Sequence, residues 1–91
     1  MDYGFLITIS FFTISTLIIY FLDNNFNPSK VFNKGYRSFK NNDYINAKKY
    51  LLKAIKLNPK NSKYFGALGS VLDFLNEYNE AELYLNKAIE I

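Results

Sequence analysis

Few side chains of this 91-residue chain could take part in catalysis or metal binding. The chain has no His and no Cys, which excludes thiolate nucleophiles, disulfides and metal sites built on those ligands. The acidic residues nearest to one another in the sequence are Glu77, Glu80 and Glu82. They come at the start of an expected helix, where negative charge complements the helix dipole. The sequence also contains no glycine-rich phosphate-binding loop. We therefore predict that the chain is not an enzyme and binds no cofactor.

Aromatic side chains at helical spacing offer binding chemistry instead. Phe32, Tyr36 and Phe39 are four and three residues apart, so one face of a helix would carry all three rings. Such a face could bind an apolar segment or a helix of a partner. The rings could equally pack against a neighbouring helix or against residues 24–28.

A run without charged residues precedes this segment, from Tyr3 to Leu22, and twelve of its residues are Leu, Ile or Phe. At ~1.5 Å per residue a helix of this length spans about 30 Å, the thickness of the hydrocarbon core of a bilayer. Its apolar side chains favour insertion by about 4–7 kcal/mol in total. We predict a transmembrane anchor over residues 1–23. A cleaved signal peptide and a buried core helix are the alternatives, and the absence of Lys or Arg before the run argues against a signal peptide.

Four hydroxyl side chains of this run share one side of the helix, within roughly 120° on a helical wheel. They could hydrogen-bond to another transmembrane helix, or to the carbonyl groups four residues earlier in their own helix. The residues concerned are Ser10, Thr13, Thr16 and Tyr20.

Positive charge follows the apolar run. Residues 28–61 hold nine Lys or Arg and one acid, whereas residues 62–91 hold two Lys and five acids. By the positive-inside rule, we predict a single-pass membrane protein with its N-terminus outside and the remainder in the cytoplasm. The basic half could also bind anionic lipid headgroups, or it could form an ordinary solvated face. The basic residues closest to the run are Lys30, Lys34, Arg37 and Lys40.

The rest of the chain repeats itself at an offset of 34 residues. Nine pairs of positions are identical at this one offset, which chance does not explain. They are Gly35/Gly69, Asn42/Asn76, Tyr44/Tyr78, Ala47/Ala81, Tyr50/Tyr84, Leu51/Leu85, Lys53/Lys87, Ala54/Ala88 and Ile55/Ile89.

Each repeat reads as two helices. Asn27 is a good N-cap before Pro28, Asn42 and Asn76 interrupt the periodic pattern, and Asp43 favours a new helix start. Apolar residues then recur at spacings of three and four. The predicted helices run from about Pro28 to Asn41, from about Tyr44 to Asn58, from about Ser62 to Leu75 and from about Tyr78 to Glu90.

These positions resemble the tetratricopeptide repeat (TPR), which has a period of 34 residues with small and large apolar residues at fixed offsets. The resemblance implies an all-α solenoid with one unit over residues 28–61 and a second over residues 62–91 without a capping helix. We predict a short linker over residues 24–27, between the anchor and the first unit. Pro59 matches the proline of the family pattern. The implied repeat core is Gly35, Tyr44, Ala47, Leu51, Ala54, Gly69, Tyr78, Ala81, Leu85 and Ala88.

In this family the first helix of each unit lines a concave groove that binds partners. By position, the groove candidates are Phe32, Tyr36, Phe39, Lys40, Lys63, Ser70, Asp73 and Phe74. Beyond the groove, Leu83 and Ile91 would form an exposed packing surface on the last helix.

The function predicted on this basis is a membrane-anchored interaction module that recruits a client or assembles a membrane complex. A small structural subunit of a larger membrane complex is one alternative. A secreted or periplasmic repeat protein, or a fragment of a longer repeat array, is another. The predicted partners are proteins, including membrane-complex subunits or a second copy of the chain, together with the bilayer, and they do not include nucleic acid.

Overall fold

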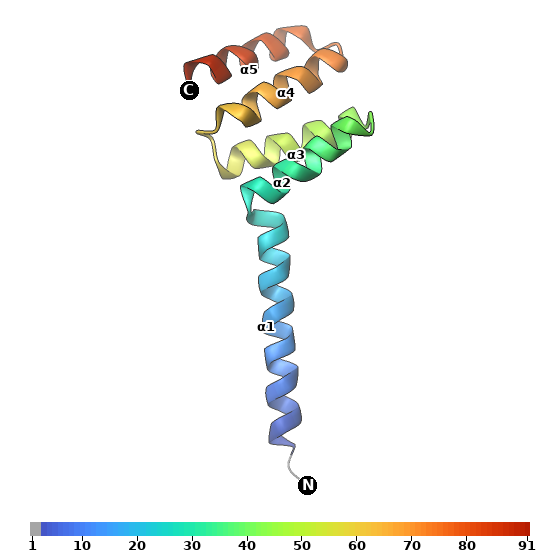
Figure 1. Cartoon of the computed structure of the whole chain (residues 1–91), viewed down its shortest axis with the longest axis vertical. Helices are drawn as coiled ribbons and strands as arrows, with labels where there is room; N and C mark the ends of the chain where they lie inside the picture. The colour runs from blue at the N-terminus through green and yellow to red at the C-terminus, as the bar shows by residue number, and fades with distance from the viewer. Residues whose placement is uncertain (1–2) are drawn as a thin grey trace.

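The structure is a computed structural model that describes residues 3–91, so the first two residues of the predicted anchor lie outside it. The described chain forms five helices and no strand. It measures 67 × 27 × 15 Å, because the first helix extends away from a domain that the other four build (Figure 1). This confirms the predicted all-α fold. The helices are α1 (Gly4–Phe26), α2 (Pro28–Lys40), α3 (Tyr44–Leu57), α4 (Ser62–Phe74) and α5 (Tyr78–Glu90).

Polar side chains cap the starts of α2 and α3, as predicted from the sequence. The Asn27 side chain accepts a hydrogen bond from the Ser29 N–H at 3.1 Å, with Pro28 at the first helical position of α2. The Asp43 carboxylate caps α3 by accepting from the Asn46 N–H at 3.3 Å. The predicted ends of the four repeat helices lie within one residue of the observed ones.

The turn inside each unit is built in the same way. Asn42 and Asn76 both have φ of 62°, a left-handed conformation that Asn adopts more readily than most residues. The hydroxyls of Tyr44 and Tyr78 donate to the side-chain oxygens of these asparagines, at 3.0 and 2.7 Å. The Asn-x-Tyr pattern, which occurs once in each unit, therefore marks the position of this turn in the sequence.

The junction between α1 and α2 differs from the predicted linker. Residues 24–26 form the last turn of α1, and only Asn27 lies between the helices. The Asn27 backbone N–H donates to the Asp23 carbonyl at 3.2 Å, and its side-chain amide donates to the Asp23 carboxylate at 3.1 Å. Lys30 forms an ion pair with the same carboxylate. Asp23 near the end of α1 thus contacts both Asn27, between the helices, and Lys30, in the first turn of α2. These contacts accompany the direct passage of the chain from one helix into the next.

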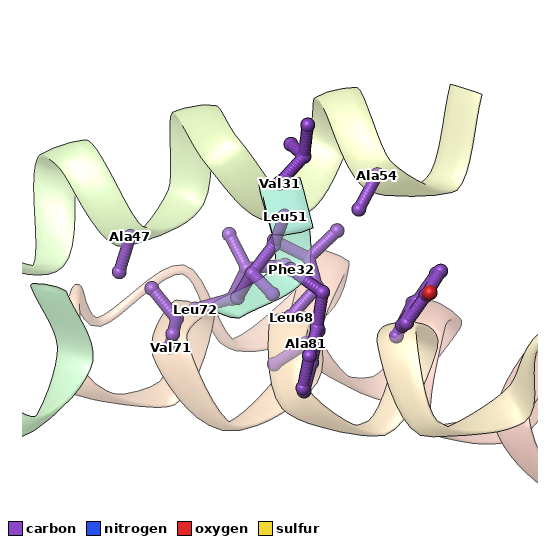
Figure 2. Packing of buried hydrophobic residues seen from close by; sticks show 10 residues of the cluster. Val31, Phe32, Ala47, Leu51, Ala54, Leu68, Val71, Leu72 and Ala81 are labelled. Atoms are coloured by element: carbon purple, nitrogen blue, oxygen red, sulfur yellow. The ribbon is translucent and has the colours of Figure 1, made fainter. Parts of the chain in front are cut away.

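The four repeat helices bury one continuous apolar core. The pairs α2–α3 and α4–α5 each pack antiparallel, and α3 packs on α4 to join the two units (Figure 1). Figure 2 shows Leu51 of α3 meeting Leu68 and Leu72 of α4 at the centre of this core. The buried cluster comprises Val31, Phe32, Ala47, Leu51, Ala54, Tyr64, Leu68, Val71, Leu72 and Ala81.

Glycine permits the close approach of the helices within each unit. A methyl group at position 69 would lie 2.6 Å from Cγ and Cδ2 of Leu85, and 3.3 Å from the Ala81 carbonyl oxygen. At Gly66, one turn earlier on the same helix, a methyl group would meet no atom within 4 Å. The two glycines of α4 therefore differ in their surroundings although they share one helix.

We expect opposite effects from the same substitution at these two glycines. Gly69→Ala should lower the free energy of unfolding by about 1–2 kcal/mol, because α4 and α5 must separate or Leu85 must leave its position. Gly66→Ala should raise it by about 0.5–1 kcal/mol, because alanine loses less backbone entropy in a helix. Urea titration of both variants in detergent would measure the difference. Equal effects would show that α5 does not pack against Gly69 as described.

Most of the predicted repeat core is inside the domain, with one exception. Six of its residues are buried, namely Gly35, Ala47, Leu51, Ala54, Gly69 and Ala81, and three are half-buried, namely Tyr44, Leu85 and Ala88. Tyr78, in contrast, is 61% exposed. Its counterpart Tyr44 stacks on Phe74 of the next unit with ring centroids 4.9 Å apart, whereas in the described chain no helix follows α5 to cover Tyr78.

Candidate partner-binding groove

A small apolar recess opens between α2 and α4. Its volume is about 140 Å³, and Tyr36, which is 45% exposed, stands beside it. The α3 side chain of Leu51 closes the recess from within the core. The recess is lined by Tyr36, Phe39, Leu51, Ala67, Ser70 and Val71. An apolar side chain of a partner is the ligand that suits such a lining.

A row of stacked rings holds the α2 side of the recess. Phe32 stacks on Tyr64 of α4 with centroids 4.9 Å apart, and Tyr36 stacks on Phe32 at 6.1 Å. Phe32 is only 5% exposed. It therefore belongs to the core, although the sequence predicts that it lines the groove. The ring of Tyr64 covers it, and this tyrosine was not among the sequence candidates. Of the predicted aromatic stripe, Tyr36 is therefore the ring most open to a partner.

A second aromatic cluster lies at the other end of the groove. Phe39 meets Phe74 edge to face at 5.4 Å, and Tyr44 stacks on Phe74. Ser70 lines the recess, and its hydroxyl donates to the Gly66 carbonyl at 3.2 Å. Asp73 is exposed but is not part of the lining. The structure thus brings Tyr36, Phe39 and Ser70 together, and places Asp73 and Phe74 beyond them.

Two lysines give the groove a positive rim. The Lys40 ammonium lies 4.9 Å from the centre of the Tyr36 ring, and the Lys63 ammonium lies 4.9 Å from the centre of the Phe32 ring. Both cations are held over the ring faces by the negative quadrupole of the π-systems. An apolar floor between two cations is complementary to an apolar side chain flanked by acidic residues.

An ion pair joins the two units outside the groove. The Lys48 ammonium of α3 donates to the Glu77 carboxylate at the start of α5, at 2.8 Å. This hydrogen bond raises the pKa of Lys48, against a smaller opposing effect of burial. The pair supports the stacking of unit two on unit one.

The last helix carries an apolar stripe, which we call the α5 stripe and define as Tyr78, Leu85 and Ile89. Tyr78 and Ile89 are exposed, whereas Leu85 is half-buried and faces Gly69 of α4. Their spacings of seven and four place them on one face, and Ile89 is 82% exposed. They are the counterparts of Tyr44, Leu51 and Ile55 of α3, of which Leu51 is in the core and the other two pack against it.

The predicted terminal surface of Leu83 and Ile91 agrees only in part with this stripe. Both residues are exposed. The counterpart of Leu83 is Lys49, which is exposed even though α4 covers α3, so Leu83 lies outside the stacking face. The counterpart of Ile91 is Leu57, which packs against the core. Comparing the two units at the 34-residue offset would have found Ile89 from the sequence.

Helix α1 has a separate surface. Its segment Leu6–Phe26 is long and apolar enough to cross a membrane, a property that membrane anchors share with signal sequences, and none of this segment is buried in the described chain. The Thr13 and Thr16 hydroxyls donate to the carbonyls of Ile9 and Phe12, both at 2.9 Å. They are therefore bonded within their own helix, whereas Ser10 and Tyr20 are exposed on its surface.

Within residues 3–91, no three acidic side chains lie close enough together to hold a metal ion.

Comparison with protein-family models gave two matches, both to the tetratricopeptide repeat family. One model matches residues 31–61 and the other matches residues 50–83. Together they cover more than half of the chain, including both sides of the groove. No curated protein and no solved structure is significantly similar to the chain.

Proposed function

The chain belongs to the tetratricopeptide repeat family, and on that premise we propose that it binds a protein partner in the groove and holds it at a membrane. The repeats are a protein–protein interaction fold, generally without catalytic activity. The observation that carries the proposal is the apolar recess beside Tyr36, because it is an open site for a side chain on the face where α2 and α4 meet.

The partner that fits this groove presents an apolar side chain with acidic neighbours. The recess of about 140 Å³ is large enough for one aliphatic or aromatic side chain. The Lys40 ammonium lies over the Tyr36 ring and the Lys63 ammonium over the Phe32 ring, and each would attract a carboxylate. This composition favours a short acidic segment or an amphipathic helix of a partner protein.

Membrane attachment is the second part of the proposal. Helix α1 exposes apolar side chains all round, and basic residues follow it directly, from Lys30 to Arg37. By the positive-inside rule, these basic residues favour an orientation with the repeats in the cytoplasm and the short N-terminus outside. The chain would act as an adaptor that recruits a client to the bilayer or helps to assemble a membrane complex.

The proposal is tested by site-specific photo-crosslinking in native membranes. We expect a photo-crosslinking amino acid at Ser70 to give one discrete protein adduct, because Ser70 lines the recess. The same group at Lys49, on the exposed outer side of α3, is the matched control and should give none. Adding Tyr36→Ala should reduce the Ser70 adduct at least about tenfold, the loss typical of an aromatic anchor. Equal adducts at Ser70 and Lys49 would contradict groove binding.

A structural subunit of a larger complex is a second candidate, and the α5 stripe favours it. In the described chain Tyr78 and Ile89 of the stripe are exposed, whereas their counterparts Tyr44 and Ile55 pack against the core. The same experiment with the photo-crosslinking group at Ile89 separates the two candidates. A strong adduct at Ile89 together with none at Ser70 would favour the permanent subunit over the adaptor.

A further inference from the structure

A polar pocket lies at the junction between α1 and α2, away from the groove. Its volume is about 490 Å³, and it shares no residue with the apolar recess. Two residues of α1 and four of α2 line it: Tyr20, Asn24, Lys30, Asn33, Lys34 and Arg37. Apart from the Tyr20 ring, these side chains end in amide or cationic groups, so the pocket offers many hydrogen-bond donors.

The charge of the pocket is positive. Lys30, Lys34 and Arg37 are four and three residues apart, so α2 turns one basic face toward the end of α1. Lys30 is paired with Asp23, and the Lys34 ammonium donates to the Asn24 carbonyl at 3.2 Å. Three cations and one carboxylate leave a net charge of +2. The exposed Arg37 side chain has the planar fork of donors that suits a phosphate group.

The pocket also lies at a defined depth along α1. The apolar run ends at Leu22, and the pocket residues Tyr20 and Asn24 stand on either side of that end. These two residues are separated by only ~6 Å along the helix axis. With the run inside the hydrocarbon core, the pocket opens at the level of the lipid phosphates, where tyrosine is also favoured.

The junction holds the two walls of the pocket in place. Asp23 accepts hydrogen bonds from Asn27 and is paired with Lys30, so these contacts connect the two helices where the chain turns from α1 into α2 (Figure 1). On another side, the Lys53 ammonium of α3 lies 5.6 Å from the centre of the Phe26 ring. The basic groups are therefore already positioned, and a ligand would not have to order a flexible linker before binding.

From these observations we propose that the junction pocket binds the phosphate of an anionic phospholipid headgroup. The proposal rests on the proposed function, because it requires α1 to span the bilayer. Arg37 and Lys34 donate to the phosphate oxygens, and the side-chain amides of Asn24 and Asn33 supply further donors. A bound headgroup would fix the direction in which the repeat domain stands on the membrane, and with it the direction in which the groove opens.

The test is lipid selectivity of the full-length chain in vesicles of phosphatidylcholine and phosphatidylglycerol. Spin-labelled lipids of each class report, by electron spin resonance, the fraction held by the protein. We expect the wild-type chain to prefer the phosphatidylglycerol label, and Lys34→Gln/Arg37→Gln to lower this preference roughly fivefold or more. Lys60→Gln/Lys87→Gln removes the same charge away from the pocket and should keep the preference.

Three results would overturn the proposal. The first is a wild-type chain without preference, and the second is an equal loss in both double variants, which would indicate general charge attraction. The third is loss of the preference when inorganic phosphate is added to the buffer, which would indicate a site for a soluble anion. Resistance of the chain to alkaline extraction is measured in parallel. An extracted chain contradicts membrane anchoring itself, whereas an inserted chain without selectivity contradicts only the headgroup site.

Discussion

A Leu68→Ala variant is expected to unfold the repeat domain at room temperature. Leu68 is fully buried where α4 meets α3 and α5, at the centre of the core (Figure 2). Truncation of such a leucine costs about 2–5 kcal/mol, because it removes apolar contacts and leaves a cavity. A domain of about 60 residues has only a few kcal/mol of stability to lose. The substitution therefore removes most or all of the free energy that keeps the four helices folded.

The matched control is Leu52→Ala, the same chemical change on α3 at a side chain that is 39% exposed. It should cost less than about 1 kcal/mol, since partly exposed side chains leave no closed cavity. Amide hydrogen exchange of the full chain in detergent measures both variants. Hydrogen exchange reports on the repeat helices and on α1 separately, and α1 should remain helical in the micelle. Protection of α4 and α5 that survives in Leu68→Ala would show that the core is not centred on this residue.

The helices of the domain were predictable because their signals are local. The helix ends depend on short-range effects: Asn27 and Asp43 cap the helix that follows them, and Asn76 adopts a left-handed φ. Such effects act within one turn, so the sequence alone is enough to predict them. The α1–α2 junction was not predictable in this way. It depends on Asp23 bonding to Asn27 and Lys30 at once, and the sequence does not show that two helices meet with one residue between them.

The groove could be predicted as a face but not residue by residue. The spacing of Phe32, Tyr36 and Phe39 places them together on α2, which the structure shows. Which of them is open depends on α4, because Tyr64 covers Phe32 and leaves Tyr36 beside the recess. Side-chain periodicity describes one helix at a time, whereas burial depends on the partner helix. The same limit explains why Tyr78, identical to the half-buried Tyr44, is exposed.

Replacement of two apolar residues of α1 by lysine, Phe11→Lys/Ile14→Lys, is expected to abolish membrane insertion. Both side chains are exposed near the middle of the apolar run. Each lysine at the centre of a membrane helix costs about 2.5–3.5 kcal/mol and replaces a residue that favours insertion. Two substitutions change the insertion free energy by about 6–8 kcal/mol, which is as large as the whole favourable contribution of about 4–7 kcal/mol from the run. Alkaline extraction of membranes should then release the variant and retain the wild-type chain.

The control Phe11→Leu/Ile14→Leu keeps the run apolar and should remain in the membrane, which excludes an effect of substitution as such. Protease added outside sealed cells should leave residues 28–91 of the control intact, because the basic side of α1 is expected in the cytoplasm. The mass of the wild-type chain decides between an anchor and a signal sequence. An anchor keeps the mass of 10.6 kDa, whereas cleavage after export shortens the chain. A shortened, protease-sensitive chain would show that α1 is absent from the mature protein. The headgroup pocket would then lack Tyr20 and Asn24.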